Sequence, residues 1–110
     1  MKLGVDGTQI HAPAGTIWGA HPVLSACQVD DIVLVIYDYM SFPKDIPARN
    51  LFAYSTDGTP LWRAEDIGQG AVDAYTAFIS EVPLVVGNFA CYDCSIDPQT
   101  GKVLSASFTK

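Results

Sequence analysis

The sequence is poor in positive charge and has no long apolar run. Six Lys and Arg residues stand against twelve Asp and Glu residues, which gives a net charge of −6. Because the phosphates of nucleic acids repel such a chain, we expect no nucleic-acid partner. The longest apolar run, residues 32–37, has six residues, whereas a membrane-spanning helix needs about 20. We therefore expect no membrane insertion.

Cysteine is also scarce, and no secretory leader is visible at the N-terminus. Cys27, Cys91 and Cys94 are odd in number, which does not suggest a disulfide framework. A secretory signal has roughly 7–15 continuous apolar residues, and Asp6 and Gly7 interrupt the start of the chain. These features predict reduced thiols in a cytoplasmic protein.

Apolar residues, by contrast, are abundant. They make up 49% of the 110 residues, which is enough for a hydrophobic core in a chain of this length. Domains cluster at roughly 100–150 residues. We therefore expect one domain that spans residues 1–110.

Strand signals dominate the chain. Residues 32–37 form a mostly β-branched run without a polar interruption, which is typical of a strand buried on both faces. Asp57 and Gly58 lie between two apolar segments and predict a hairpin with a type I′ turn. A second hairpin is expected around the Pro98 and Gly101 turn. The expected strands cover residues 32–37, 50–55, 60–64, 84–86, 89–96 and 102–108.

Two segments resist assignment to strands. Residues 38–49 carry two prolines and residues 66–70 carry two glycines, so both are expected to be loops. Residues 71–79 are ambiguous. The spacing of Ala71, Tyr75 and Phe78 allows a short helix, but the composition around Tyr75 favours a strand.

Similar turns recur along the chain. Gly58 and Gly101 are 43 residues apart, and a comparable turn at Gly7 lies 51 residues before Gly58. Intervals of roughly 40–50 residues are typical of propeller blades. The turns indicate either an internal duplication or the common chemistry of hairpins.

The hairpin segments resemble a known repeat. The sequence NLFAYSTDGTPLWRAE, residues 50–65, looks like the quinoprotein-type (PQQ-like) β-propeller repeat, and SIDPQTGKVLSASFTK, residues 95–110, has the same style. Small bacterial proteins with a Thr-Lys ending are similar over residues 30–110. The resemblance implies a blade-like antiparallel sheet. It carries over no quinone or metal ligand, and a closed propeller typically needs 4–8 blades.

Four residues form the strongest candidate for site chemistry. Cys91 and Cys94 form a C-x-x-C pair, and His11 and His21 are the only histidines. Together they are the candidate ligands for zinc, or the functional groups of a small enzyme. However, a redox pair usually begins a helix, and residues three apart on a strand point to opposite faces. We therefore favour structural packing, with no cofactor and no catalytic residue.

The long loop is the strongest candidate for an interaction site. Tyr39 and Phe42 are aromatic residues in a proline-bearing loop, and Asp38 and Asp45 flank them. Exposed aromatic residues beside carboxylates predict a protein-binding patch. Alternatively, the loop folds back and seals the sheet.

These observations predict an all-β fold. We expect an antiparallel meander of seven to nine strands, arranged as a small sandwich or as an incomplete propeller-like sheet. Such a sheet leaves open edges, so edge pairing or face packing into a homodimer is expected. The predicted function is a non-enzymatic protein-interaction module, adaptor-like or inhibitor-like, with a possible protein partner. The alternative is a small ligand-binding or zinc-binding protein, or an enzyme, that uses His11, His21, Cys91 and Cys94.

Overall fold

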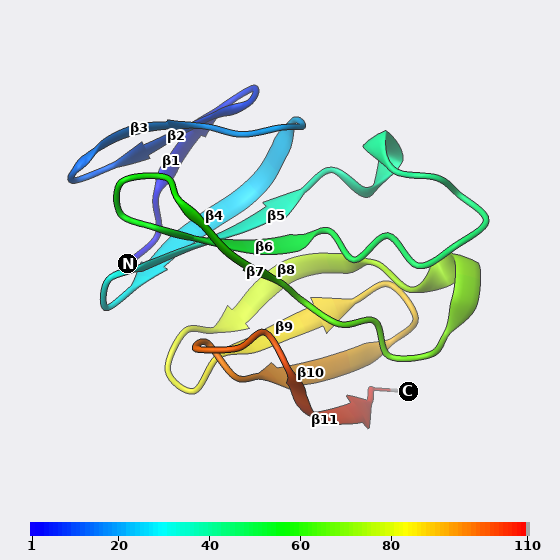
Figure 1. Cartoon of the computed structure of the whole chain (residues 1–110). Helices are drawn as coiled ribbons and strands as arrows, with labels where there is room; N and C mark the ends of the chain where they lie inside the picture. Colours follow the sequence, from blue (N-terminus) through cyan, green and yellow to red (C-terminus); the bar gives the residue numbers. More distant parts are fainter. Residues whose placement is uncertain (110) are drawn as a thin grey trace.

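A computed structural model describes residues 1–109 and shows an all-β protein (Figure 1). The expected fold class is confirmed, but the described chain has eleven strands rather than seven to nine. Lys110, at the end of the expected single domain and of the Thr-Lys ending, lies outside the described residues. The strands are β1 (Gly4–Asp6), β2 (Gln9–Ala12), β3 (Gly15–Trp18), β4 (Val23–Val29), β5 (Ile32–Tyr37), β6 (Leu51–Ser55), β7 (Pro60–Arg63), β8 (Tyr75–Ser80), β9 (Val85–Asn88), β10 (Tyr92–Ile96) and β11 (Val103–Phe108).

The additional strands lie in the N-terminal quarter of the chain. Only a turn at Gly7 was expected there, yet β1 to β4 occupy this region. They are short, or alternate apolar with polar residues less regularly than β5 does, so their sequence pattern is weak. Two single 3-10 turns, η1 (Tyr39–Ser41) and η2 (Gly70–Val72), complete the secondary structure. No helix within residues 1–109 is long and apolar enough to cross a membrane.

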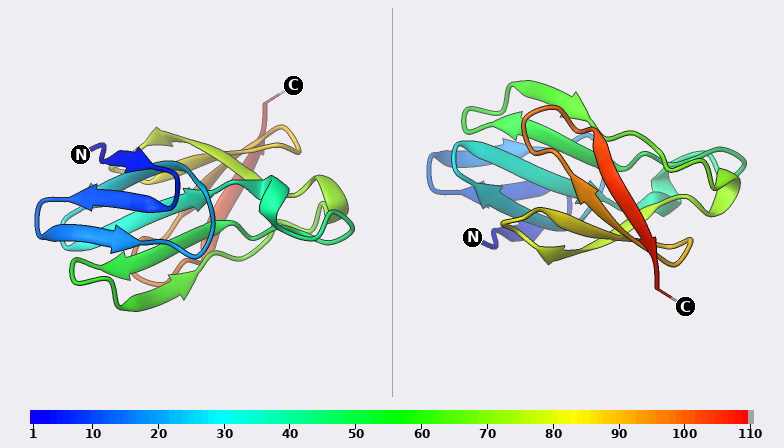
Figure 2. Two further views of the ribbon diagram at one scale, coloured as in Figure 1. Left: turned by 90° about the horizontal axis from the view of Figure 1, so that it is seen from above. Right: turned by 90° about the horizontal axis from the view of Figure 1, so that it is seen from below.

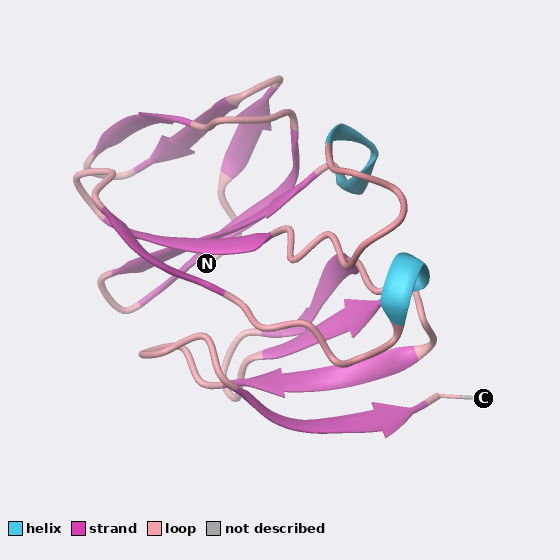
Figure 3. Ribbon diagram, turned by 45° about the vertical axis from the view of Figure 1, so that its right-hand side comes forward, coloured by secondary structure: helices cyan, strands magenta, loops and turns pink. Residues whose placement is uncertain are grey.

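The strands form three antiparallel meander sheets, each built from strands consecutive in the chain. The first sheet has the order β1-β2-β3, the middle sheet β4-β5-β6-β7, and the last sheet β11-β10-β9-β8. Figures 2 and 3 show that the three sheets are stacked as layers. The two larger sheets have the four strands of a propeller blade.

Strand β5 lies in the centre of this stack, and all six of its residues are buried. Ile32, Leu34 and Ile36 belong to the hydrophobic core shared with the last sheet. The alternating residues Val33, Val35 and Tyr37 belong to the core shared with the first sheet. The expectation of a strand buried on both faces is confirmed, because β5 has a layer on each side.

The turn at Asp57 and Gly58 joins β6 to β7 as expected, but its type differs from the expected one. A type I′ turn needs positive φ at both central residues, and only Gly58, with a φ of 88°, has it. The Gly58 N–H donates to the Ser55 carbonyl at 2.9 Å. The Asp57 carboxylate accepts hydrogen bonds from Ser55 and Thr59, and these bonds lower its pKa. A single glycine therefore suffices, because the carboxylate stabilises the turn before it.

The sheets also correct the expected turn repeat. Gly58 and Gly101 lie in the turns of the last hairpins of two sheets, with φ of 88° and 78°, and Gly15, with a φ of 137°, is the first residue after the corresponding turn in the first sheet. These three glycines are spaced at two equal intervals of 43 residues. Gly7 lies instead in the first hairpin of the first sheet, so its interval of 51 residues joins turns that are not equivalent.

Two of these glycines also connect neighbouring sheets. A Cβ atom on Gly58 would lie 3.8 Å from the side chain of Ile17 in the first sheet. A Cβ atom on Gly101 would lie only 2.4 Å from the Trp62 ring in the middle sheet. The Trp62 indole N–H also donates to the Pro98 carbonyl at 2.9 Å. Each glycine turn thus packs against the last strand of the sheet before it.

The ambiguous and irregular segments are now placed. Residues 75–80 form strand β8, so the strand favoured within residues 71–79 is confirmed, and η2 precedes it. Residues 38–49 and 66–70 are connections, with η1 in the first and the start of η2 in the second. The continuous strand expected over residues 89–96 is wrong at its start. Residues 89–91 form a turn, in which Cys91 has a φ of 72° and donates its N–H to the Asn88 carbonyl at 3.0 Å.

Candidate functional site

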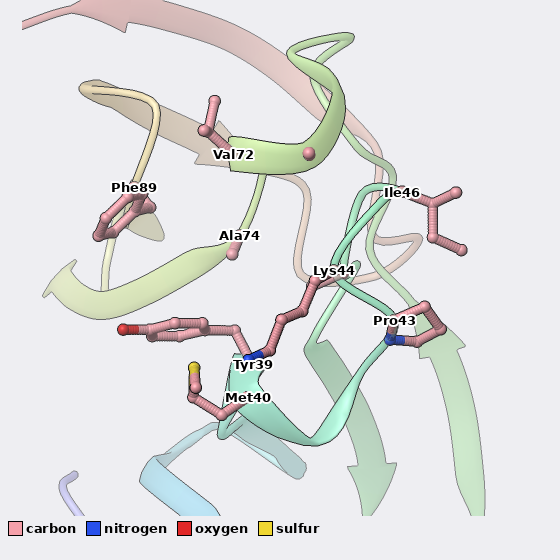
Figure 4. A pocket seen from close by; sticks show the side chains of 10 residues that line it. Tyr39, Met40, Pro43, Lys44, Ile46, Val72, Ala74 and Phe89 are labelled. Carbon is pink, nitrogen blue, oxygen red and sulfur yellow. The ribbon is translucent and has the colours of Figure 1, made fainter.

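An apolar groove lies at the end of the molecule where the long loop projects. Its volume is about 190 Å³. Three segments form it: the loop after β5, the region around η2, and the turn after β9 (Figure 4). The lining residues are Tyr39, Met40, Pro43, Lys44, Ile46, Ala48, Ala71, Val72, Ala74 and Phe89.

The first wall begins at the 3-10 turn η1. The Asp38 carboxylate caps this turn by accepting a hydrogen bond from the Met40 N–H at 2.9 Å. Tyr39 is half-buried, and its ring centroid lies 5.9 Å from that of Phe89 across the groove. The cap therefore fixes where Tyr39 meets the opposite wall.

The end of the long loop is held by two arginines. The Arg63 guanidinium donates to the carbonyls of Ala48 and Arg49, each at 2.9 Å. Arg49 in turn donates to the Ala64 carbonyl at 3.0 Å. The Arg63 guanidinium also lies over the Phe42 and Phe52 rings, at 5.7 and 5.1 Å from their centroids. Burial lowers the pKa of Arg63, which nevertheless stays charged at neutral pH.

A buried asparagine connects the base of the loop to the last sheet. Asn50 is fully buried, and its side-chain amide donates to the carbonyls of Tyr37 and Tyr75 at 2.7 and 2.8 Å. Its side-chain oxygen accepts the Tyr75 N–H at 2.8 Å. One side chain thus joins the end of β5, the start of β6 and the start of β8.

A buried aspartate fixes the second wall in the same way. Asp73 is 1% exposed, and its carboxylate accepts the N–H groups of Ile67 and Gln69 at 2.7 and 3.1 Å. The other carboxylate oxygen accepts the Asn88 amide at 2.9 Å. The Asp73 backbone carbonyl also accepts the Ala48 N–H at 3.0 Å. These bonds satisfy both oxygens of the buried carboxyl group, and they hold all three groove segments together.

The groove surface is apolar and open to solvent. Met40, Ile46, Val72 and Phe89 are each at least half exposed, and Phe89 is 57% exposed. Lys44 is the only charged residue in the lining. Large apolar side chains clustered at the surface mark interaction sites more often than scattered ones do.

The structure separates the four residues predicted for interaction. Tyr39 lines the groove, and Asp38 caps η1 beside it. Asp45 is exposed on the same loop. Phe42 lies outside the groove lining, where it packs on His21 at a centroid distance of 4.5 Å. Both aromatic residues are half-buried rather than fully exposed, so Phe42 follows the alternative in which the loop seals the sheet.

The candidate zinc or enzyme residues are dispersed. His11 lies on β2 and His21 precedes β4, while Cys91 is in the turn before β10 and Cys94 is buried within that strand. Residues 1–109 contain no group of three or more His, Cys, Asp or Glu side chains that could hold a metal.

The two buried thiols are also poor nucleophiles. Burial raises the pKa of Cys27 to about 12, with a further contribution from the Glu81 carboxylate. Burial, Asp73 and Asp93 raise the pKa of Cys94 to about 11. Since the thiolate is the nucleophile and the metal ligand, both side chains are protonated at neutral pH and serve packing.

Sequence reasoning identified the loop that supplies six of the ten lining residues, but it singled out only Tyr39 among them. Met40, Ile46, Val72 and Phe89 are apolar residues in connections, and this is the one signal that the sequence offers for them. Their convergence depends on Asp73, Asn88 and Asn50, whose partners lie up to 25 residues away. Such contacts between distant segments are not visible in local patterns.

The fold and groove thus define a class: an all-β protein of three stacked meander sheets with an apolar surface groove at one end. The chain matches a family model described as Domain of unknown function (DUF7957) over residues 1–108, and it belongs to that family. No curated protein and no solved structure matches the chain.

Proposed function

We propose that the protein is a non-enzymatic protein-interaction module, adaptor-like or inhibitor-like, whose groove accepts an apolar side chain of a partner protein. The observation that carries this proposal is the groove itself, with its exposed Met40, Ile46, Val72 and Phe89. Its size suits one or two side chains rather than a drug-sized ligand, since ligand pockets typically measure about 300–1,000 Å³.

The hydrogen bonds at the base of the groove support this function. The groove walls are fixed by the buried Asn50 and Asp73, and by the Arg63 bonds to the end of the loop. A preformed surface loses little conformational entropy on binding, so more of the contact energy appears as affinity. Aromatic and methionine side chains such as Tyr39 and Met40 are also enriched in protein interfaces.

The charge distribution favours a basic partner. Among residues 1–109 one ion pair forms, between the Met1 ammonium and the Glu81 carboxylate. Arg49 and Arg63 are used by backbone carbonyls. The net charge of −6 speeds association with a partner of opposite charge.

The free thiols support localisation of the protein in a reducing compartment such as the cytoplasm. Cys27, Cys91 and Cys94 are all free. Buried free thiols are compatible with a cytosolic environment, in which glutathione and thioredoxin keep cysteines reduced.

The test compares two exposed aliphatic positions. Val72 is 50% exposed in the groove, and Leu61 is 48% exposed on β7 and is not part of the groove lining. The proposal predicts that a partner captured from the native host binds wild type and Leu61→Asp but is lost with Val72→Asp. Loss with neither variant, while both remain folded by circular dichroism, would refute the groove as the binding site.

Salt dependence provides a second readout on the captured pair. Screening shortens the range of the acidic field to about 8 Å at physiological ionic strength. We expect the association rate to fall as salt rises, with little change in dissociation. A rate independent of salt would contradict a basic partner.

A further inference from the structure

Strand β11 is the most exposed strand of the described chain. It lies at the outer edge of the last sheet (Figures 1 and 3). Five of its six residues are exposed, including Leu104 at 65% and Phe108 at 59%. None of the six is charged or proline. An uncharged edge strand offers its free backbone N–H and C=O groups to another strand.

The other long edges are protected. Strand β4 is covered by the first residues of the chain, since the Leu3 N–H donates to the Ala26 carbonyl at 2.9 Å. Strand β7 contains Pro60 and Arg63, and both residue types discourage edge pairing. Strand β8 has two register shifts against β9. The single irregularity of β11 lies near its start, between the pairs of Ser105 and Val103.

The sequence of β11 is self-complementary. Residues 104–108 read Leu-Ser-Ala-Ser-Phe, which is symmetric in character about Ala106. Because side chains alternate along a strand, Ala106 and Phe108 share one face and Ser105 and Ser107 share the other, whereas Leu104 is the residue without a partner on β10 at the register shift. The Ala106 face is the inner one, since Ala106 pairs with the buried Cys94.

We propose that β11 pairs antiparallel with β11 of a second copy of this chain, with the two-fold axis at Ala106. Leu104 then lies opposite the second copy's Phe108, and Ser105 lies opposite the second copy's Ser107. The two Ala106 residues meet at the axis and the serine hydroxyl groups meet on the other face, and such cross-strand pairs stabilise a sheet. The two last sheets become one continuous sheet through an isologous contact.

The outer face of the last sheet argues for edge pairing rather than face packing. Ser105 is paired with Ser95, and Ser107 with Asp93, so these four residues lie on the face turned away from the middle sheet. The part of that face formed by β10 and β11 is small and polar, as in the capping unit of a repeat protein. The edge, by contrast, leaves Leu104 and Phe108 more than half exposed, although the Phe108 ring lies 5.2 Å from that of Tyr92 between centroids.

The charge of the chain sets how the dimer responds to salt. Each copy carries a net charge of −6, so two copies repel at long range, and salt screens this repulsion. The dimer is therefore stronger at high salt. This is opposite to the salt dependence expected for a basic partner in the groove.

The test uses two exposed alanines on the two edge strands of the same sheet. Ala106 is on β11 and Ala77 on β8. Sedimentation equilibrium up to about 1 mM protein covers the weak range of small interfaces. We expect wild type and Ala77→Lys to dimerise and Ala106→Lys to remain monomeric, because two lysines would face each other at the axis.

A mixture then tests the register. Ala106→Lys and Ala106→Glu should each be monomeric, whereas an equimolar mixture should form a heterodimer through opposite charges at the axis. Wild type that remains monomeric at every concentration and salt level overturns the proposal. So does a dimer that Ala106→Lys leaves intact. Val72→Asp leaves the dimer unchanged, so failure here is distinguishable from failure of the groove.

Discussion

Strands β5 and β11 have the same length and opposite environments. Both have six residues, yet every residue of β5 is buried and five of the six in β11 are exposed. Strand β5 has a hydrogen-bonded strand on each side and a sheet against each face. Strand β11 has one neighbouring strand and almost no cover. Position in the stack therefore sets the burial of each strand.

The sequences of the two strands reflect these positions. Strand β5 reads IVLVIY without a polar residue, whereas β11 inserts serine at alternate positions. The serine hydroxyl groups on one face of β11 can hydrogen-bond to water. The exposed apolar residues of the strand remain available for a partner. The contrast teaches that an apolar residue in this fold contributes to stability at the centre and to association at the edge.

The largest expected effect comes from equal truncations in the two strands. Leu34 is fully buried and Leu104 is 65% exposed. We expect Leu34→Ala to lower the free energy of unfolding by about 3 kcal/mol, because it loses buried area and leaves a cavity. Leu104→Ala should change it by less than about 0.5 kcal/mol.

Urea unfolding at about 1 μM protein, where a weak dimer is dissociated, measures both free energies. Similar losses in the two variants would show that β11 is packed as tightly as β5, and the comparison would fail.

The same contrast explains how much of the fold could be predicted. Strand β5 has an unbroken apolar run, and its burial on both faces was recognised from residues 32–37 alone. The turns at Gly58 and Gly101 were found because glycine and its neighbours determine local geometry. Strands β1 to β4 were missed, because Thr16, Ser25 and Gln28 interrupt their apolar pattern. The matching of Gly15 with Gly58 became visible only once the sheets were defined.

The groove was predictable only in part. The loop of residues 38–49 was identified from its two prolines. Tyr39 was identified as an aromatic residue within that loop. Phe42 has the same local context, yet it packs on His21 and beneath Arg63. What separates the two aromatic residues is their long-range partners, since Tyr39 faces Phe89 whereas Phe42 packs on His21 and under Arg63. No local pattern contains that information.

A second prediction concerns the point where β11 begins. Gly101 precedes the exposed strand but is itself buried against Trp62, and its φ is 78°. Gly101→Ala meets both the Trp62 ring and an unfavourable φ, so it should destabilise the protein by about 2–3 kcal/mol. Gly7 has a φ of 60° with nothing near its missing side chain, and Gly7→Ala should cost only about 1 kcal/mol.

Thermal and urea unfolding of the two variants measure the difference. Equal costs would mean that the Trp62 ring moves aside freely. The contact between the last and middle sheets would then not limit substitution at this turn.

The smallest expected effect is a difference between a buried and a half-exposed cysteine in how the free energy of unfolding depends on alkaline pH. The native pKa of Cys27 is raised to about 12 from 9.0, chiefly by burial. Above pH 9 the unfolded thiol loses its proton while the native one keeps it, so stability falls as pH rises from about 9 towards 12. At pH 10 one such thiol lowers the free energy of unfolding by about 1 kcal/mol.

Two alanine variants isolate this contribution. Cys27→Ala removes the buried thiol beside β5, and Cys91→Ala removes the half-exposed thiol in the turn before β10. Between pH 8 and pH 10 the loss of stability should be smaller in Cys27→Ala than in Cys91→Ala, by about 1 kcal/mol. If urea midpoints show the same loss in both variants, then Cys27 ionises in the native state. Water must in that case reach Cys27. The contrast between a buried centre and an exposed edge would then not hold at this position.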